Sequence, residues 1–140
     1  MSEAMRLRAD HAKLARMFRQ LEHIVERPWP PPQVELFEFR HALMTALIGH
    51  LKLEDWALYP RLIESGDDEI SAKGQEFKDE MGGLEPAFVA YCEKWTASAI
   101  PSDWAAYCDE TRAILDALVD RLTRENRELL PLLDQIDRAA

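Results

Sequence analysis

Glycine, cysteine and strand-forming patterns are scarce in this sequence. Five glycines and two cysteines occur in 140 residues, and no run alternates β-branched with polar residues. A β fold needs such runs, whereas the abundance of Leu, Ala, Glu and Arg favours an all-α fold. Cys92 and Cys108 have no second cysteine or histidine at metal-binding spacing. We therefore expect reduced thiols, with a disulfide between two helices as the other possibility.

Positive charge and long apolar runs are also scarce. Seventeen basic residues are scattered among 26 acidic ones, and the resulting net charge of −9 argues against a nucleic-acid partner. No apolar run reaches the roughly 18 residues of a membrane span, and Met1–Arg6 lacks the apolar region of a signal peptide. We expect a cytoplasmic protein that binds a metal ion, a small molecule or a protein, and neither nucleic acid nor membrane.

Three breaks divide the chain into four periodic segments. The breaks are Pro28–Pro32, Ser65–Asp68 and Ala99–Asp103, which contain proline, glycine or helix-capping residues. The predicted helices cover roughly residues 3–26, 33–64, 68–97 and 103–137. Helices of this length with short connections lie antiparallel to their sequence neighbours. We therefore predict one domain over residues 1–140, an up-down-up-down four-helix bundle.

Several polar side chains lie on helix faces that are predicted to be buried. His11 falls within the apolar stripe of the first helix, and Arg121 and Glu125 share the inward face of the fourth. In the second helix, one arc contains Phe39, Leu43, His50, Glu54 and Ala57. His23 and His41 are predicted on the surface. Because a buried carboxylate requires a cation or donors, either a metal or Arg121 must supply positive charge.

Three motifs carry a resemblance to a known family. They are Asp10-His11, the segment from His50 and Glu54 through Leu58-Tyr59-Pro60-Arg61-Leu62, and the segment from Arg121 and Glu125 through Leu129-Leu130-Pro131-Leu132-Leu133. Over nearly its whole length the chain resembles the hemerythrin-like, or HHE cation-binding, family. This resemblance implies the same bundle and a site for two irons. Histidines of the first two helices would hold one iron, histidines of the last two the other, and two carboxylates would bridge them.

The motifs match only half of that two-iron site. The resemblance implies that His11 and His50 are the nitrogen ligands of one iron, and that Glu54 and Glu125 are the bridging carboxylates. The histidines for the second iron are missing, because residues 51–140 contain none.

Other residues stand at the lost ligand positions. Arg121 occupies the fourth-helix position, and either Phe77 or Lys78 occupies the third-helix position. Because arginine is always charged, Arg121 places a permanent cation near the place of the missing iron, where its planar fork can hold Glu54 or Glu125.

Two hypotheses of different classes follow, and neither describes an enzyme. In the first, His11, His50, Glu54 and Glu125 hold one iron, manganese or zinc ion for metal sensing or redox regulation. In the second, the core is metal-free, Arg121 pairs with the glutamates, and an outer helix face binds a protein partner or a second copy in a homodimer. A third option is a small-molecule pocket opened by Gly82, Gly83 and Pro86. Reversible oxygen carriage is not expected, since the resemblance implies that it uses two irons.

Two aromatic residues beside His50 and Glu54 each have two interpretations. Tyr59 either donates a hydrogen bond to a site carboxylate or only packs in the core. Trp56 points away from the His50 face, so it either covers a loop or contacts a partner.

Overall fold

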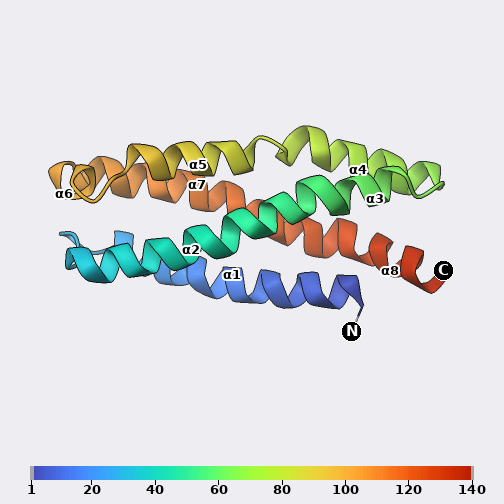
Figure 1. Cartoon of the computed structure of the whole chain (residues 1–140), viewed down its shortest axis with the longest axis horizontal. Helices are drawn as coiled ribbons and strands as arrows, with labels where there is room; N and C mark the ends of the chain where they lie inside the picture. The colour runs from blue at the N-terminus through green and yellow to red at the C-terminus, as the bar shows by residue number, and fades with distance from the viewer. Residues whose placement is uncertain (1, 140) are drawn as a thin grey trace.

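The computed structural model describes residues 2–139, and every regular element within them is helical (Figure 1). This confirms the prediction of an all-α protein. The elements are α1 (Glu3–Val25), α2 (Gln33–Leu53), the π-helical turn η1 (Glu54–Leu58), α3 (Tyr59–Ile63), α4 (Asp68–Met81), α5 (Leu84–Lys94), α6 (Ala99–Ser102), α7 (Trp104–Arg124), the π-helical turn η2 (Glu125–Leu129) and α8 (Leu130–Ala139).

Successive long segments run in opposite directions along the molecule (Figure 1). The first segment is α1, the second is α2 continued by η1 and α3, the third is α4 with α5, and the fourth is α7 continued by η2 and α8. Both chain ends and the α3–α4 turn lie at one end of the molecule, and α6 lies at the other. None of the helices in residues 2–139 combines the length and the apolar character needed to cross a bilayer.

Short polar side chains begin the helices where the sequence predicted starts. The N–H of Met5 donates to Ser2 Oγ at 3.2 Å. Asp67 Oδ1 accepts from the N–H groups of the second and third residues of α4, at 3.0 and 3.1 Å. At the start of α7, Asp103 Oδ1 accepts from the N–H of Ala106 at 3.2 Å. Gly66, between α3 and α4, has the only positive φ among the described residues, at 84°.

The third predicted helix is divided at Gly82–Gly83 into α4 and α5. Its predicted end was wrong, because α5 ends at Lys94 rather than near residue 97. The predicted break Ala99–Asp103 contains the single turn α6. Pro101 is compatible with that turn, because a proline in the first turn of a helix removes no internal hydrogen bond.

Each of the two long segments that carry a site glutamate contains a π-helical turn. The N–H of Tyr59 donates to Glu54 O, and the N–H of Leu130 donates to Glu125 O, so both bonds span five residues. Pro60 and Pro131 follow immediately. A proline ring clashes with the carbonyl four residues before it and supplies no N–H, which favours a wider turn at this point.

The wider turns change which residues face inward beyond them. One extra residue rotates the following helix face by about 100°. Ala57 was predicted to face inward, and this is wrong, since Ala57 is exposed while Leu58 is buried. In α8 the buried positions are Leu130 and Leu133.

The apolar core consists of two clusters. One joins residues such as Leu14, Leu51 and Leu122, and the other joins residues such as Leu7, Leu58 and Leu129. His11, Glu54 and Glu125 each belong to a different long segment. Along its own segment, each lies between a residue of one cluster and a residue of the other. The predicted site is therefore a polar layer between two apolar regions.

The packing of α3 against α4 depends on Gly74. A Cβ atom at this position would lie 2.9 Å from Leu62 Cβ and 3.2 Å from the backbone nitrogen of Ile63. We expect Gly74→Ala to lower the free energy of unfolding by about 1–3 kcal/mol through overpacking. Gly49→Ala is the matched control, because a Cβ there meets no atom within 4 Å and alanine is favoured in a helix by up to about 1 kcal/mol. Urea unfolding of both variants should give opposite signs, and equal signs would contradict this account.

Candidate metal centre

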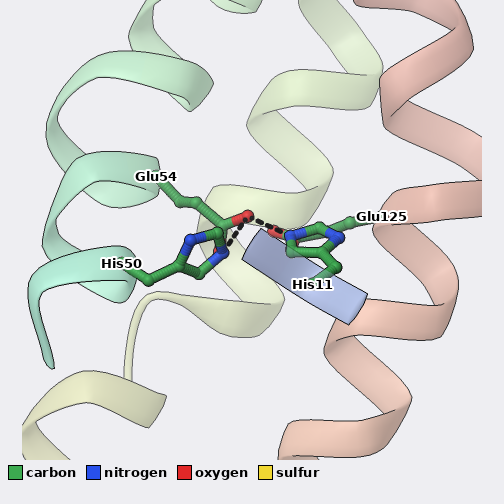
Figure 2. A group of neighbouring side chains, drawn as sticks. All are labelled: His11, His50, Glu54 and Glu125. Carbon is green, nitrogen blue, oxygen red and sulfur yellow. Dashed lines mark hydrogen bonds and ion pairs between the residues drawn. The ribbon is translucent and has the colours of Figure 1, made fainter. Parts of the chain in front are cut away.

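Four buried side chains converge between the helices (Figure 2). His11 comes from α1, His50 from the last turn of α2, and Glu54 and Glu125 are the first residues of η1 and η2. One ligand atom from each residue lies within 4.8 Å of those of the other three. The structure thus brings together the four residues that the sequence singled out as metal ligands.

Both imidazoles direct Nε2 toward carboxylate oxygens. Glu54 Oε2 lies 3.0 Å from His11 Nε2 and 3.1 Å from His50 Nε2 (Figure 2). His11 Nε2 is also 3.4 Å from Glu125 Oε1. The two rings meet edge to face, with centroids 4.9 Å apart. A single small region is therefore surrounded by two ring nitrogens and two carboxylate oxygens.

The outward nitrogens of the two imidazoles face other polar groups. His11 Nδ1 lies 2.7 Å from Asn126 Oδ1, and since that oxygen only accepts, Nδ1 is the donor. His50 Nδ1 lies 3.6 Å from Asp10 Oδ2. With its proton on Nδ1, a neutral His11 turns the Nε2 lone pair toward Glu54. Two lone pairs face each other in that arrangement, so a cation or a second proton is required between them.

Unpartnered polar atoms concentrate in the same cluster. Within residues 2–139, six buried side-chain nitrogen or oxygen atoms have no hydrogen-bond partner. Four of the six belong to the cluster: His50 Nδ1, His50 Nε2, Glu125 Oε1, and Glu54 Oε1, which lies 3.3 Å from Arg121 without a hydrogen bond. Buried polar groups without partners are rare in folded proteins. Imidazole nitrogen and carboxylate oxygen are ligands that iron, manganese and zinc accept, so these residues fit one such ion.

Arg121 contacts the other oxygen atoms of the same two glutamates. Its side chain is fully buried, and it lies 3.3 Å from Glu54 Oε1 and 3.4 Å from Glu125 Oε2. It also contacts Asp55 Oδ1 at 2.9 Å and donates to Met81 O at 3.0 Å. Each glutamate therefore has one oxygen beside the histidines and the other beside Arg121.

Tyr59 completes the contacts of Glu125. Its hydroxyl donates to Glu125 Oε2 at 2.5 Å, and Arg121 Cζ lies 5.3 Å from the centre of its ring. Of the two interpretations of Tyr59, the structure supports the hydrogen bond to a site carboxylate. Burial and the charge of Glu125 raise the pKa of Tyr59, so the hydroxyl stays protonated as a donor.

The two glutamates have opposite pKa shifts. Burial raises the pKa of Glu125, and the negative charge of Glu54 raises it further. Burial acts in the same direction on Glu54, but its contacts with the imidazoles of His11 and His50 outweigh burial, and the pKa of Glu54 is lower than usual. Burial disfavours the charge of Arg121, yet the acidic groups around it keep its pKa above the ordinary value. The site therefore combines an ionised carboxylate with one that readily accepts a proton or a cation.

The remaining residues named from the sequence lie outside this cluster. At the third-helix position, Phe77 is fully buried, with its ring centre 6.5 Å from that of Tyr59, and Lys78 is exposed. His23 and His41 are exposed, which confirms the prediction that they lie on the surface. Trp56 is also exposed and lies against the Lys52 ammonium.

Two residues that contact the site, Asp55 and Asn126, were missed by the sequence reasoning. Each directly follows a site glutamate, and on a regular α-helix a neighbour points about 100° away. Both lie within the π-helical turns, where the wider backbone lets consecutive side chains serve one site. The available signal was the proline placed six residues after each glutamate.

A helical protein that directs histidines and carboxylates from separate helices into its core belongs to the class that builds metal sites inside a helix bundle. A family model described as the hemerythrin HHE cation binding domain matches residues 4–133. The chain belongs to this family, as the motifs around His50 and Arg121 indicated. Comparisons with curated proteins and with solved structures gave no match.

Proposed function

We propose that the chain binds one iron, manganese or zinc ion through His11, His50, Glu54 and Glu125, with Arg121 in the place of a second metal. The observation that supports this most strongly is the division of the glutamate oxygens. Glu54 and Glu125 each offer one oxygen to the histidine side and one to Arg121. Bridging carboxylates between two cations have this arrangement, and here one of the two cations is a guanidinium.

The charges around Arg121 favour a second cation. Glu54, Asp55 and Glu125 contribute up to three negative charges, against one permanent positive charge from Arg121. Since buried charges need compensation, a proton on Glu125, whose pKa is raised, reduces this imbalance when no metal is bound. One divalent cation together with Arg121 would balance the three carboxylates.

The proposed role is metal-dependent or redox-dependent regulation rather than catalysis or reversible oxygen carriage. A bound iron would supply a change of one electron at a fixed site. His11, His50, Glu54 and Glu125 come from three of the four long segments, so binding would hold these segments together. A ligand at 100 times its dissociation constant stabilises a fold by about 2.7 kcal/mol, which is enough to couple metal supply to bundle stability. We also propose that the chain forms a single domain with the up-down-up-down topology predicted from the sequence.

A second candidate is a metal-free interaction module. It is favoured by the ion pairs of Arg121 with Glu54, Asp55 and Glu125, which already give these carboxylates a cation. The exposed Trp56 gives this candidate a surface for a protein partner or a second copy. In this case the histidines serve only the packing and hydrogen bonding of the core.

Elemental analysis of protein purified without chelator from metal-supplemented medium separates the two candidates. We expect one iron, manganese or zinc ion per chain, and a higher melting temperature with the metal than after its removal. The variant Arg121→His should still bind one ion, because Phe77 offers no ligand at the third-helix position. No metal in the parent protein would refute the first candidate in favour of the second. Two ions per chain in the parent protein would refute the proposal that Arg121 takes the place of a second metal.

A further inference from the structure

Helix α6 lies at the end of the molecule away from both chain ends (Figure 1), and a mostly apolar pocket lies beside it. It has a volume of about 290 Å³ and lies between the first half of α2, the end of α5 and α6. Its apolar walls include Leu36, Phe37, Met44, Trp95 and Ile100. This place differs from the small-molecule pocket predicted near Gly82, Gly83 and Pro86. The volume is at the lower limit of the ~300–1,000 Å³ typical of ligand sites.

Arg40 is the charged group in this pocket, and it has no counterion among residues 2–139. Five arginines in residues 2–139 are buried or partly buried: Arg8, Arg40, Arg61, Arg121 and Arg124. All except Arg40 form ion pairs with carboxylates of residues 2–139. Arg40 makes one long hydrogen bond, 3.5 Å to Cys92 O, and Cζ lies 5.9 Å from the ring centre of Tyr107. Most of its five donors therefore remain open to a ligand.

The lining of the pocket contains no acidic residue, although the chain has 26 of them. His41 and Gln33 are the other polar groups beside Arg40 on α2, and the ring of His41 stacks on Phe37 with centroids 6.2 Å apart. The local charge is thus opposite to the net charge of −9. A ligand complementary to this surface has an apolar body and a single negative group.

A small cavity behind the pocket contains a further unpartnered polar group. Arg40, Met44 and Cys92 line both spaces, and the cavity, of about 10 Å³, also touches Tyr107. The Tyr107 hydroxyl is fully buried and has no hydrogen-bond partner among residues 2–139. The cavity has about the volume that one water molecule needs. Arg40 therefore lines both the pocket and the small cavity beside the buried Tyr107.

We propose that this pocket binds a small molecule with an apolar body and one carboxylate group, and that Arg40 recognises the carboxylate. The guanidinium can donate two parallel hydrogen bonds to a carboxylate, a geometry that an alcohol cannot accept. The apolar walls contact the body of the ligand, and its removal from water favours binding. The proposal does not depend on metal binding at His11 and His50.

Calorimetric titration with octanoate and with 1-octanol, in the presence of a chelator, tests the proposal. We expect one saturable site for octanoate, with a dissociation constant at least about 10-fold lower than that for octanol, because only the acid forms charge-assisted hydrogen bonds. Arg40→Met keeps the apolar stem and removes the charge, so acid and alcohol should bind this variant with similar affinity. Arg16→Met is the matched control, because Arg16 is exposed on α1 and lies outside the pocket. Arg16→Met should keep the preference of the parent protein for octanoate over 1-octanol.

Three results would overturn the proposal. Equal affinity of the parent protein for the acid and the alcohol would remove the role of Arg40, and this comparison needs no variant. Absence of saturable binding for either compound would show that the pocket is not a site for such a ligand. Dimerisation that buries the pocket and is unaffected by octanoate, measured by sedimentation, would make it an interface between two copies.

Discussion

Replacing His50 by alanine is expected to weaken the binding of a divalent metal by more than about 100-fold. His50 Nε2 is buried, has no hydrogen-bond partner and lies 3.1 Å from Glu54 Oε2, so a bound ion would lose one of its two imidazole ligands. Asn126→Ala removes the group that orients His11 and should weaken binding by about 10–100-fold, the usual cost of losing a hydrogen bond to a metal-ligating histidine. Competition with a chromogenic chelator for Zn²⁺ measures both effects.

His41→Ala is the control for this comparison, because His41 lies on the same helix as His50 but is exposed. The expected order of dissociation constants is parent and His41→Ala lowest, Asn126→Ala intermediate and His50→Ala highest. If His50→Ala and His41→Ala bound zinc as tightly as the parent, the metal would lie elsewhere and the proposed centre would be wrong. If the parent bound none, the metal-free candidate would stand.

Much of the candidate site could be predicted because its residues lie before the π-helical turns or at their first position. His11 and Leu7 share one face of α1 at a spacing of four. The same spacing separates His50 from Glu54 on the second segment and Arg121 from Glu125 on the fourth. The period of 3.6 residues is valid for each pair, since the π-helical turns begin only at the two glutamates. Periodicity was therefore sufficient to place these residues on buried helix faces, and the resemblance to the hemerythrin-like family supplied their role as candidate ligands.

The contacts beyond the glutamates could not be predicted in the same way. The bonds of Asp55 to Arg121 and of Asn126 to His11 depend on a backbone that leaves the α-helical period after Glu54 and Glu125. The choice between Phe77 and Lys78 was also open, because the third helix could not be aligned to one residue. In the structure the packing of α4 buries Phe77 near Tyr59 and leaves Lys78 exposed.

Replacing Arg121 by methionine is expected to lower the free energy of unfolding of the metal-free protein by about 3–5 kcal/mol. The substitution removes the only permanent cation that contacts Glu54 and Glu125 within residues 2–139, and both side chains are fully buried. Breaking a buried ion pair by removing one partner leaves an uncompensated buried charge, which typically costs this amount. Urea unfolding in the presence of a chelator measures the change.

Arg124→Met is the matched control, three residues further along the same helix. Arg124 pairs with Glu80 and Glu128, which are partly or largely exposed, and such pairs contribute at most about 1 kcal/mol. A similar cost for both variants would mean that Arg121 acts through packing rather than through its charge. Adding Glu54→Gln and Glu125→Gln to Arg121→Met should recover part of the loss, because the carboxylates that need the cation are then absent.

The effect of metal on Arg121→Met connects this stability to the proposed function. If one divalent ion binds the glutamates on the histidine side, it supplies positive charge to the same two carboxylates that Arg121 contacts. The cost of Arg121→Met should then be smaller in zinc-saturated protein than in metal-free protein, whereas the cost of Arg124→Met should not change. An equal cost of Arg121→Met in both states would contradict the idea that the guanidinium and the metal compensate the same charges. The ion and Arg121 contact different oxygens of each glutamate. Comparing the cost of Arg121→Met with and without zinc therefore tests whether Arg121 takes the place of a second metal.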